Sequence, residues 1–298
     1  MNATVLIPPQ TVNLTTLEIV KGELKLTTTD AARDAWIQDR IEQASLAIQD
    51  ELDRPLTRQQ VQERFDGNGR MLAALELTPI ASLDSLKNAW LGEIDLSITT
   101  LGNEVARIDN AEAGLIWRNY GFADDSPQKV WLTVDSMAQA GAKPWQATYH
   151  GGWLTRADDL TASGFTASGT DIIRNDGGIM PLVAPGDQIA LSGWALNRGR
   201  FVVSARTDDS ISVENILVVE VAGAGAAVQV RNLPAGLERA CIDTVRSWFY
   251  LRTQNTGYKA ESIGDWSATY GDPTGAAERA NVLPGAVVTT LDRWRRLM

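Results

Sequence analysis

Two side chains that often perform acid–base or nucleophilic chemistry each occur once in the sequence, as His150 and Cys241. A Ser-His-Asp relay would have to use His150, but the chain has no Gly-x-Ser-x-Gly turn that would present the serine. Because two glycines follow His150, we expect its imidazole to make a structural hydrogen bond. Cys241 lies within an apolar helical pattern, which favours a small buried side chain over a reactive thiolate.

Carboxylate pairs and glycine-rich turns are the other features that could do chemistry. Asp-Asp pairs occur at 124–125, 158–159 and 208–209, each in a predicted loop, where adjacent carboxylates are usually solvated. Gly67-Asn68-Gly69 and Gly223-Ala224-Gly225 lack the third glycine of a dinucleotide-binding turn, and neither precedes a predicted helix. One histidine and one cysteine cannot supply the usual zinc ligands. We therefore expect no catalytic residues, no cofactor and no metal, and the chain is not predicted to be an enzyme.

The composition sets the size and class of the protein. The chain has 298 residues, of which 44% are hydrophobic, and a formal net charge of −10 at pH 7. This length is typical of two domains with packed cores. No apolar run reaches the roughly 20 residues that cross a bilayer, and we expect neither a membrane segment nor a signal peptide. An acidic chain is poorly suited to hold nucleic acid, because phosphate contacts require clustered Lys and Arg.

Helical periodicity occurs near both ends of the chain. A short helix is expected over 11–24, and a longer one begins at Asp30 as N-cap and ends before Pro55. Another helix is predicted from Leu233-Pro234 to about residue 255, because proline is favourable in a first turn. A terminal helix is expected over 283–298.

Strand patterns fill the segment between these helices. Runs at 60–65 and 71–79 flank Asp66-Gly67-Asn68-Gly69, which predicts a hairpin. Further strands are expected over 82–98, 106–118, 129–136 and 143–153. From 155 to 232 short β runs, among them 188–192, 210–214 and 217–221, alternate with Gly, Asp and Pro turns, as in a small all-β barrel or sandwich. We therefore predict an α+β fold in which a helical-bundle core with antiparallel strands (1–153 and 234–298) is interrupted by an inserted β domain (154–233).

A series of short motifs runs along the predicted discontinuous domain. In chain order these are Glu51-Leu52-Asp53-Arg54-Pro55-Leu56, Phe65-Asp66-Gly67-Asn68-Gly69, Leu75-Glu76-Leu77-Thr78-Pro79-Ile80, Thr148-Tyr149-His150-Gly151-Gly152-Trp153 and Glu261-Ser262-Ile263-Gly264-Asp265-Trp266-Ser267. In this order they resemble the tailed-phage head–tail connector proteins, also called adaptors or head completion proteins. The resemblance covers about 1–153 and 234–298. The insert departs from that family's pattern and resembles a small β module of various virion proteins through Gly186-Asp187-Gln188-Ile189 and Asn197-Arg198-Gly199-Arg200-Phe201.

The resemblance implies a structural protein of the virion neck. Such adaptors form a ring of neighbouring copies, most often twelve, under the portal protein, where they extend the DNA channel and dock a tail or stopper protein. The acidic composition suits this place, because a negative wall lets DNA pass without specific binding. The protein would be found in the host cytoplasm during assembly and at the head–tail neck afterwards.

Two sets of side chains are candidate contacts in such an assembly. The terminal helix is the expected portal contact, through Leu283, Val287, Val288, Leu291, Trp294, Arg295, Arg296 and Leu297; alternatively, this helix packs on the bundle. A ring requires two different surfaces that close on themselves, and tryptophan is enriched at interfaces. The ring-interface candidates are Trp90, Trp117, Trp131, Trp145 and Trp153, for which the alternative is a place in a core or on a strand face.

Two further functions stay open on the sequence. The chain could be a stopper or tail-side completion protein, whose ring would meet the adaptor instead of the portal. It could also be a binding module of the virion surface, in which the β insert recognises a glycan or a capsid surface.

Overall fold

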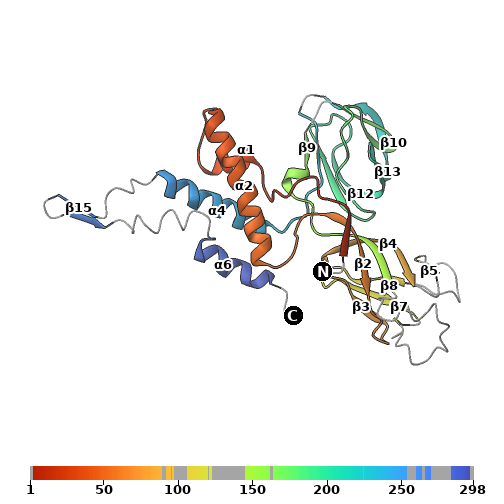
Figure 1. The fold of residues 1–298 in the computed structure, drawn as a ribbon. Coiled ribbons are helices and arrows are strands. Elements are labelled where there is room, and N and C mark those ends of the chain that lie inside the picture. The colour runs from red at the N-terminus through yellow and green to blue at the C-terminus, as the bar shows by residue number, and fades with distance from the viewer. Residues whose placement is uncertain are drawn as a thin grey trace. The chain divides into compact units, whose positions relative to one another are not determined.

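A computed structural model describes residues 3–88, 92–94, 96, 106–119, 121–122, 145–161, 164–223, 225–253, 260–263, 266–269 and 283–295. Figure 1 shows its elements in chain order. The helices are α1 (Leu17–Glu23), α2 (Ala31–Glu51), η2 (Arg156–Asp158), α4 (Ala235–Thr253), α6 (Gly285–Leu291) and η3 (Asp292–Trp294). The strands are β1 (Ala3–Ile7), β2 (Gln59–Phe65), β3 (Leu72–Ala74), β4 (Ile80–Asn88), β5 (Gly92–Ile94), β6 (Ala106–Asn110), β7 (Leu115–Arg118), β8 (Trp145–Gly151), β9 (Leu160–Thr161), β10 (Phe165–Arg174), β11 (Gln188–Ser192), β12 (Gly199–Arg206), β13 (Ser210–Val221), β14 (Ala227–Gln229), β15 (Ala260–Ile263) and β16 (Trp266–Thr269).

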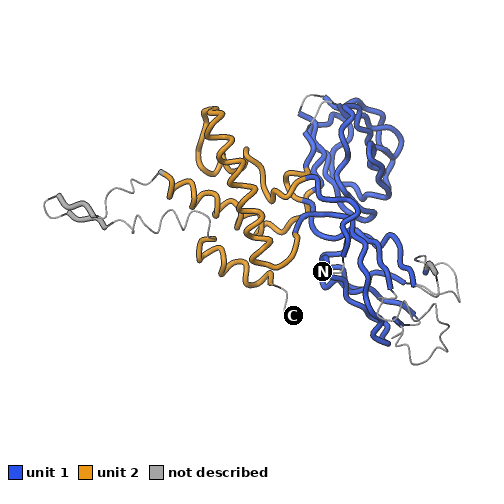
Figure 2. Tube along the Cα trace, viewed as in Figure 1, with its two compact units in different colours: residues 1–10, 56–154, 159–230 blue, residues 11–55, 155–158, 231–298 orange. Residues whose placement is uncertain are grey.

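The chain divides into two compact units, coloured separately in Figure 2. The strand unit contains residues 1–10, 56–154 and 159–230, and the helical unit contains 11–55, 155–158 and 231–298. All pairings between the strands named above are antiparallel, so the predicted combination of helices with antiparallel sheets is confirmed. The predicted domains group strands 56–153 with the helices, whereas compactness groups them with 159–230. The predicted domain boundaries and the helical-bundle core stay predictions.

The first half of the strand unit holds a five-stranded sheet in the order β1-β2-β8-β4-β5 and a three-stranded sheet in the order β3-β7-β6. Alternate residues of β2 and β8 are buried, as the period of two in a strand requires. Phe65, Phe122 and Trp145 pack together in this core, with ring centroids 5.1 to 6.4 Å apart. The predicted strand at 129–136 lies outside the described residues.

The hairpin predicted across Asp66–Gly69 is wrong. Strand β2 pairs with β1 and β8, while β3 pairs with β7. The Asn68 side chain donates to the Leu72 carbonyl at 2.8 Å and accepts from the Arg70 amide at 2.9 Å, so the turn leads the chain into the other sheet. Residues 75–79 also form no strand, because side chains of other strands accept hydrogen bonds from the Glu76 and Leu77 amides.

The predicted β insert forms a six-stranded sheet in the order β10-β13-β12-β11-β14-β9. Its buried side chains, among them Phe165, Ile189, Trp194 and Val213, form a hydrophobic core whose members all lie between residues 154 and 230. The runs predicted at 210–214 and 217–221 are one continuous strand, β13, which bulges against β10 between the pairs Gly169↔Leu217 and Asp171↔Ser212. This bulge explains the break in alternation near Asn215.

The helices follow their sequence signals closely. Asp30 caps α2 by accepting hydrogen bonds from the Ala32 and Arg33 amides, each at 3.1 Å. The predicted apolar face of α2 is buried, with Ile37 and Ile41 fully so. Helix α1 is shorter than the predicted 11–24, and the terminal helix of 283–298 is reduced to α6 followed by the 3₁₀ turn η3.

Candidate docking surface on the helical unit

His150 takes part in a hydrogen-bonded cluster that links strands β2, β4 and β8. Its Nδ1 lies 3.0 Å from Ser82 Oγ and 3.0 Å from Asp84 Oδ2, and Gln60 donates to Asp84 at 2.8 Å. A catalytic relay places its serine and its carboxylate on different ring nitrogens, whereas both groups face Nδ1 here. Burial acts to raise the pKa of Asp84, but hydrogen bonds from His150, Gln60 and Ser82 hold this pKa below its usual value. His150 thus makes hydrogen-bonding contacts within the sheet, as expected from the sequence.

Cys241 is fully buried in α4, and this desolvation raises the pKa of its thiol to about 12. The prediction of a small buried side chain is confirmed. Across the described ranges, no three His, Cys, Asp or Glu side chains gather in a way that could hold a metal ion. No helix in the described part of the chain is long and apolar enough to span a membrane.

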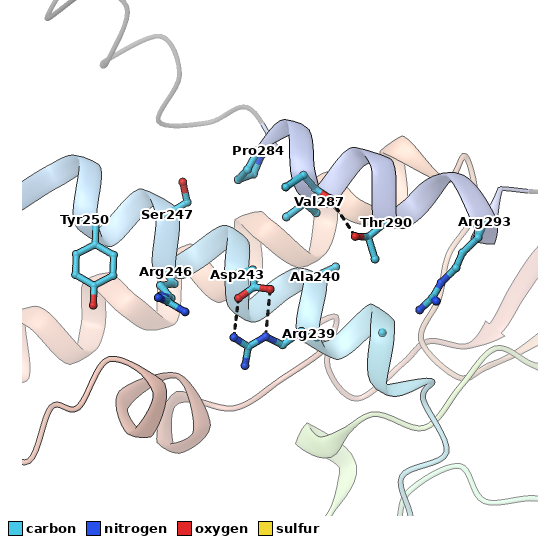
Figure 3. Close-up of a pocket in the computed structure, with 12 residues that line it drawn as sticks. Arg239, Ala240, Asp243, Arg246, Ser247, Tyr250, Pro284, Val287, Thr290 and Arg293 are labelled. Carbon is cyan, nitrogen blue, oxygen red and sulfur yellow. Dashed lines mark hydrogen bonds and ion pairs between the residues drawn. The ribbon is translucent and has the colours of Figure 1, made fainter. Parts of the chain in front are cut away.

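The terminal helix α6 packs against α4 within the helical unit (Figure 3). Val287 is 5% exposed and Leu291 is fully buried, so these two predicted portal contacts form part of the packing between helices. Leu283, Val288 and Trp294 are half-buried, and Arg295 is exposed. Arg296 and Leu297 lie outside the described residues. The alternative in which this helix packs on its neighbours therefore describes the structure.

Polar contacts hold the end of α6 and η3 to the end of α2. Arg54 Nη2 donates to the Trp294 carbonyl at 3.0 Å, and Arg295 forms an ion pair with Glu51. Arg54 belongs to the connector-like motif after α2, which gives this motif residue a role in seating the terminal helix. Helix α6 and the turn η3 are thus held against α2 and α4.

A groove of about 520 Å³ lies between α4 and α6 (Figure 3). Ala240 and Val287 are the buried residues in its lining. Its exposed lining includes Arg239, Arg246, Tyr250, Ala286, Thr290 and Arg293. The α4 residues of this set share one helix face, because they lie seven and four residues apart, which is about two turns and one turn.

The arginines of the groove have different partners. Arg239 pairs with Asp243 at 3.0 Å and with Glu23 at 3.1 Å, and the hydrogen bond that Arg239 donates to Asp243 raises the pKa of Arg239. In contrast, Arg246 lies over the ring of Tyr250 and Arg293 over the ring of Trp294, with Cζ 5.9 and 5.1 Å from the ring centroids. The lining also contains the carboxylate of Asp243 and the hydroxyls of Ser247 and Thr290.

The sequence contains part of the pattern that indicates this groove, namely the spacing of the α4 residues that line it. Arg239, Asp243, Arg246 and Tyr250 recur at spacings of four, three and four within the helix predicted from residue 234. That spacing predicts a charged helix face. The packing of α6 alongside that face could not be predicted, because it depends on two segments that lie about 50 residues apart in the chain.

The tryptophans proposed for a ring interface lie in different surroundings. Trp145 is fully buried in the core of the five-stranded sheet, and Trp153 is 5% exposed, so for these two the core alternative holds. Trp117 on β7 is half-buried, with Arg107 Cζ 4.9 Å from its ring centroid. Trp90 and Trp131 lie outside the described residues.

Arg58 is a further residue that the sequence did not single out. Its guanidinium is 2% exposed and contacts Asp187 at 2.9 Å, while its Nε donates to the Gly152 carbonyl at 2.8 Å. Asp187 also accepts a hydrogen bond from the Ala184 amide at 2.7 Å. The aspartate of the insert's Gly-Asp-x-Ile motif therefore joins the insert to the segment before β2.

Comparisons with known proteins give little. No family model and no curated protein matches the chain. One solved structure, titled as the neck of an empty GTA particle computed with C6 symmetry, is similar over 100% of this chain and 97% of its own, at 12% identity and a TM-score of 0.34. A TM-score this low does not establish a common fold.

Proposed function

We propose that this chain is a structural virion protein that works by assembly and not by catalysis. In this proposal it is a head–tail adaptor, which forms a ring under the portal, extends the DNA channel and docks a tail or stopper protein. The observation that carries the proposal is the ordered series of connector-like motifs on both sides of the insert.

Contacts between these motifs support the proposal. The Tyr149 hydroxyl accepts a hydrogen bond from the Leu77 amide at 3.0 Å and donates to Glu63 at 2.7 Å. The Gly152 amide donates to the Pro79 carbonyl at 2.9 Å, and its φ of +87° favours glycine. Residues of the Leu-x-x-x-Pro-Ile and Tyr-x-x-Gly motifs thus hold one another in place, as expected for parts of one framework.

Binding measurements with separate partners would test the adaptor role. The purified full chain is added to immobilised portal rings and, separately, to immobilised tail and stopper components. An adaptor binds portal rings without any other virion protein. Binding only to a preformed portal–adaptor complex, or only to tail components, would favour the stopper or tail-side completion protein instead.

An exposed apolar patch on the insert favours a second candidate, a module that binds a virion surface. Ile216, Val218, Val219 and Val221 on β13 are 54 to 85% exposed, and Leu196 is 64% exposed. Asn197 holds Leu196 beside β13, because its side chain bonds both the amide and the carbonyl of Val218 at 2.9 and 2.7 Å. Exposed apolar groups gathered in this way often mark interaction sites.

Polar substitutions in this patch would test the second candidate. If the patch attaches the chain to capsids, Val219→Ser with Val221→Ser lowers the amount that cosediments with tailless capsids. Portal binding that is unchanged in the same variant would show that the two surfaces act separately. Unchanged cosedimentation would rule out the patch as the attachment site.

A further inference from the structure

We propose that the groove between α4 and α6 is the docking site for an acidic segment of a partner protein. The apolar side chains of that segment would lie against Pro284 and Ala286, and its carboxylates would meet Arg246 and Arg293. This inference rests on the proposed function, and deepens it by giving the chemistry of the partner that the helical unit receives.

Charge is the first argument. Because Arg239 is paired with Asp243 and Glu23, Arg246 and Arg293 supply the positive charge of the groove, within a chain whose net charge is −10. A positive strip on an acidic protein attracts an acidic surface and repels a basic one. It would also select one face of this chain for that partner, because the chain as a whole repels acidic molecules.

The surroundings of Arg246 and Arg293 are the second argument. Both side chains are exposed, and each lies over an aromatic ring, of Tyr250 and Trp294 respectively. A contact with the face of a ring uses no N–H group of the guanidinium, so these groups can donate hydrogen bonds to a ligand. Two parallel N–H donors match the two oxygens of a carboxylate, which favours aspartate and glutamate as the groups bound.

Small side chains give the groove its room. Ala240 and Ala286 line it, and Gly236 in the first turn of α4 lies under the Arg293 guanidinium, which a Cβ at that position would overlap. The resulting volume of about 520 Å³ accommodates several side chains of a bound segment. An amphipathic segment laid into a groove between two helices is a common mode of peptide recognition.

The lining favours a protein partner over DNA. The exposed Ala286 and the half-buried Pro284 offer apolar contacts that a phosphate backbone cannot use. A peptide carries apolar side chains that can contact these residues. The observations therefore point to an acidic peptide segment.

Binding of synthetic peptides to the full chain tests the inference. The probe is a fluorescein-labelled peptide of about 15 residues, roughly four helical turns, with leucines on one face and glutamates on the other. The control probe has lysine in place of every glutamate. Arg246→Glu combined with Arg293→Glu removes the two carboxylate sites, and Arg64→Glu combined with Arg200→Glu makes the same charge change at exposed positions of the strand unit.

We expect the acidic probe to bind and the basic probe not to bind, by fluorescence anisotropy at low salt. The groove variant should raise the dissociation constant of the acidic probe at least about tenfold, while the control variant changes it less than about threefold. Failure of the acidic probe to bind would overturn the inference. The inference would also be overturned if a DNA duplex bound the wild type more tightly than the acidic probe and the groove variant lost this binding. Self-association of the wild type that is absent in the groove variant would overturn it as well. If the chain binds portal rings but does not bind the acidic probe, the groove is not the docking site, while the adaptor role is still supported.

Discussion

At the scale of single residues, the ion pair of Arg58 and Asp187 connects distant parts of the strand unit. The side chain of Arg58 is 2% exposed and that of Asp187 is 13% exposed, and both also form hydrogen bonds with the backbone. A buried charge that loses its partner is much more costly than the pair is stabilising. We therefore expect the β insert and the five-stranded sheet to unfold together when this pair is intact, and not when it is broken.

Arg58→Met tests this role of the pair. Because it leaves Asp187 uncompensated, we expect a loss of about 3–5 kcal/mol in the free energy of unfolding, measured by urea denaturation. Arg64→Met, at an exposed position of β2, should change that free energy by less than about 0.5 kcal/mol. Equal losses in the free energy of unfolding for the two substitutions would show that the Arg58–Asp187 pair contributes no more than an exposed residue.

Glu220 gives a prediction about pH. Desolvation acts to raise its pKa, but hydrogen bonds from the Ala195, Leu196 and Asn197 amides and from the Asn197 side chain hold this pKa below the usual value. Because the pKa is lower in the folded state, the stabilisation is complete above the ordinary pKa of about 4.5. It is lost as the pH falls through the folded pKa.

Glu220→Gln should therefore lower amide-exchange protection at residues 195–197 and lower the unfolding midpoint at pH 7. The difference in midpoint between wild type and variant should shrink steadily as the pH is lowered below about 4. A difference that stays constant down to pH 3 would show that the ionised carboxylate is not the group that holds the loop.

At the scale of elements, the packing of α6 differs from what the sequence predicted. Its apolar side chains were expected to meet the portal, yet Val287 and Leu291 are buried against the helical unit. A portal contact made by this helix would therefore use its exposed face, with Ala286, Thr290 and Arg293, together with the neighbouring face of α4.

Leu291→Ala measures how firmly α6 is packed. A large-to-small change at a fully buried leucine costs about 2–5 kcal/mol, so amide exchange of 285–291 should accelerate strongly in this variant. Thr289→Ala, at an exposed position of the same helix, is the matched control and should leave exchange nearly unchanged. Amides of α6 that are already unprotected in the wild type would contradict a packed α6 and favour the predicted portal contact through its apolar side chains.

Elements with local signals were predictable from the sequence, and elements with distant partners were not. The N-terminus of α2 follows from the Asp30 cap, and the predicted strand Gln188–Ser192 matches β11. The hairpin after β2 failed because the Asn68 turn directs β3 to β7, a partner that lies about 40 residues away. For the same reason the groove and the Arg58–Asp187 pair were missed: each depends on packing between segments far apart in sequence.

At the scale of the whole molecule, the net charge of −10 and the positive groove give complementary expectations. In the proposed adaptor, a ring of such chains would present a mostly negative surface, which would not retain DNA. Its positive strip then remains available for an acidic partner. Both expectations follow from charge alone and do not depend on the number of copies in the ring.

The adaptor proposal is tested most directly by electron microscopy of purified portal rings mixed with the full chain. The proposal predicts a second ring of density stacked coaxially on one end of the portal, with an open central channel and with the helical unit at the contact. Portal rings without added density, or single copies of the chain bound at irregular positions, would contradict it.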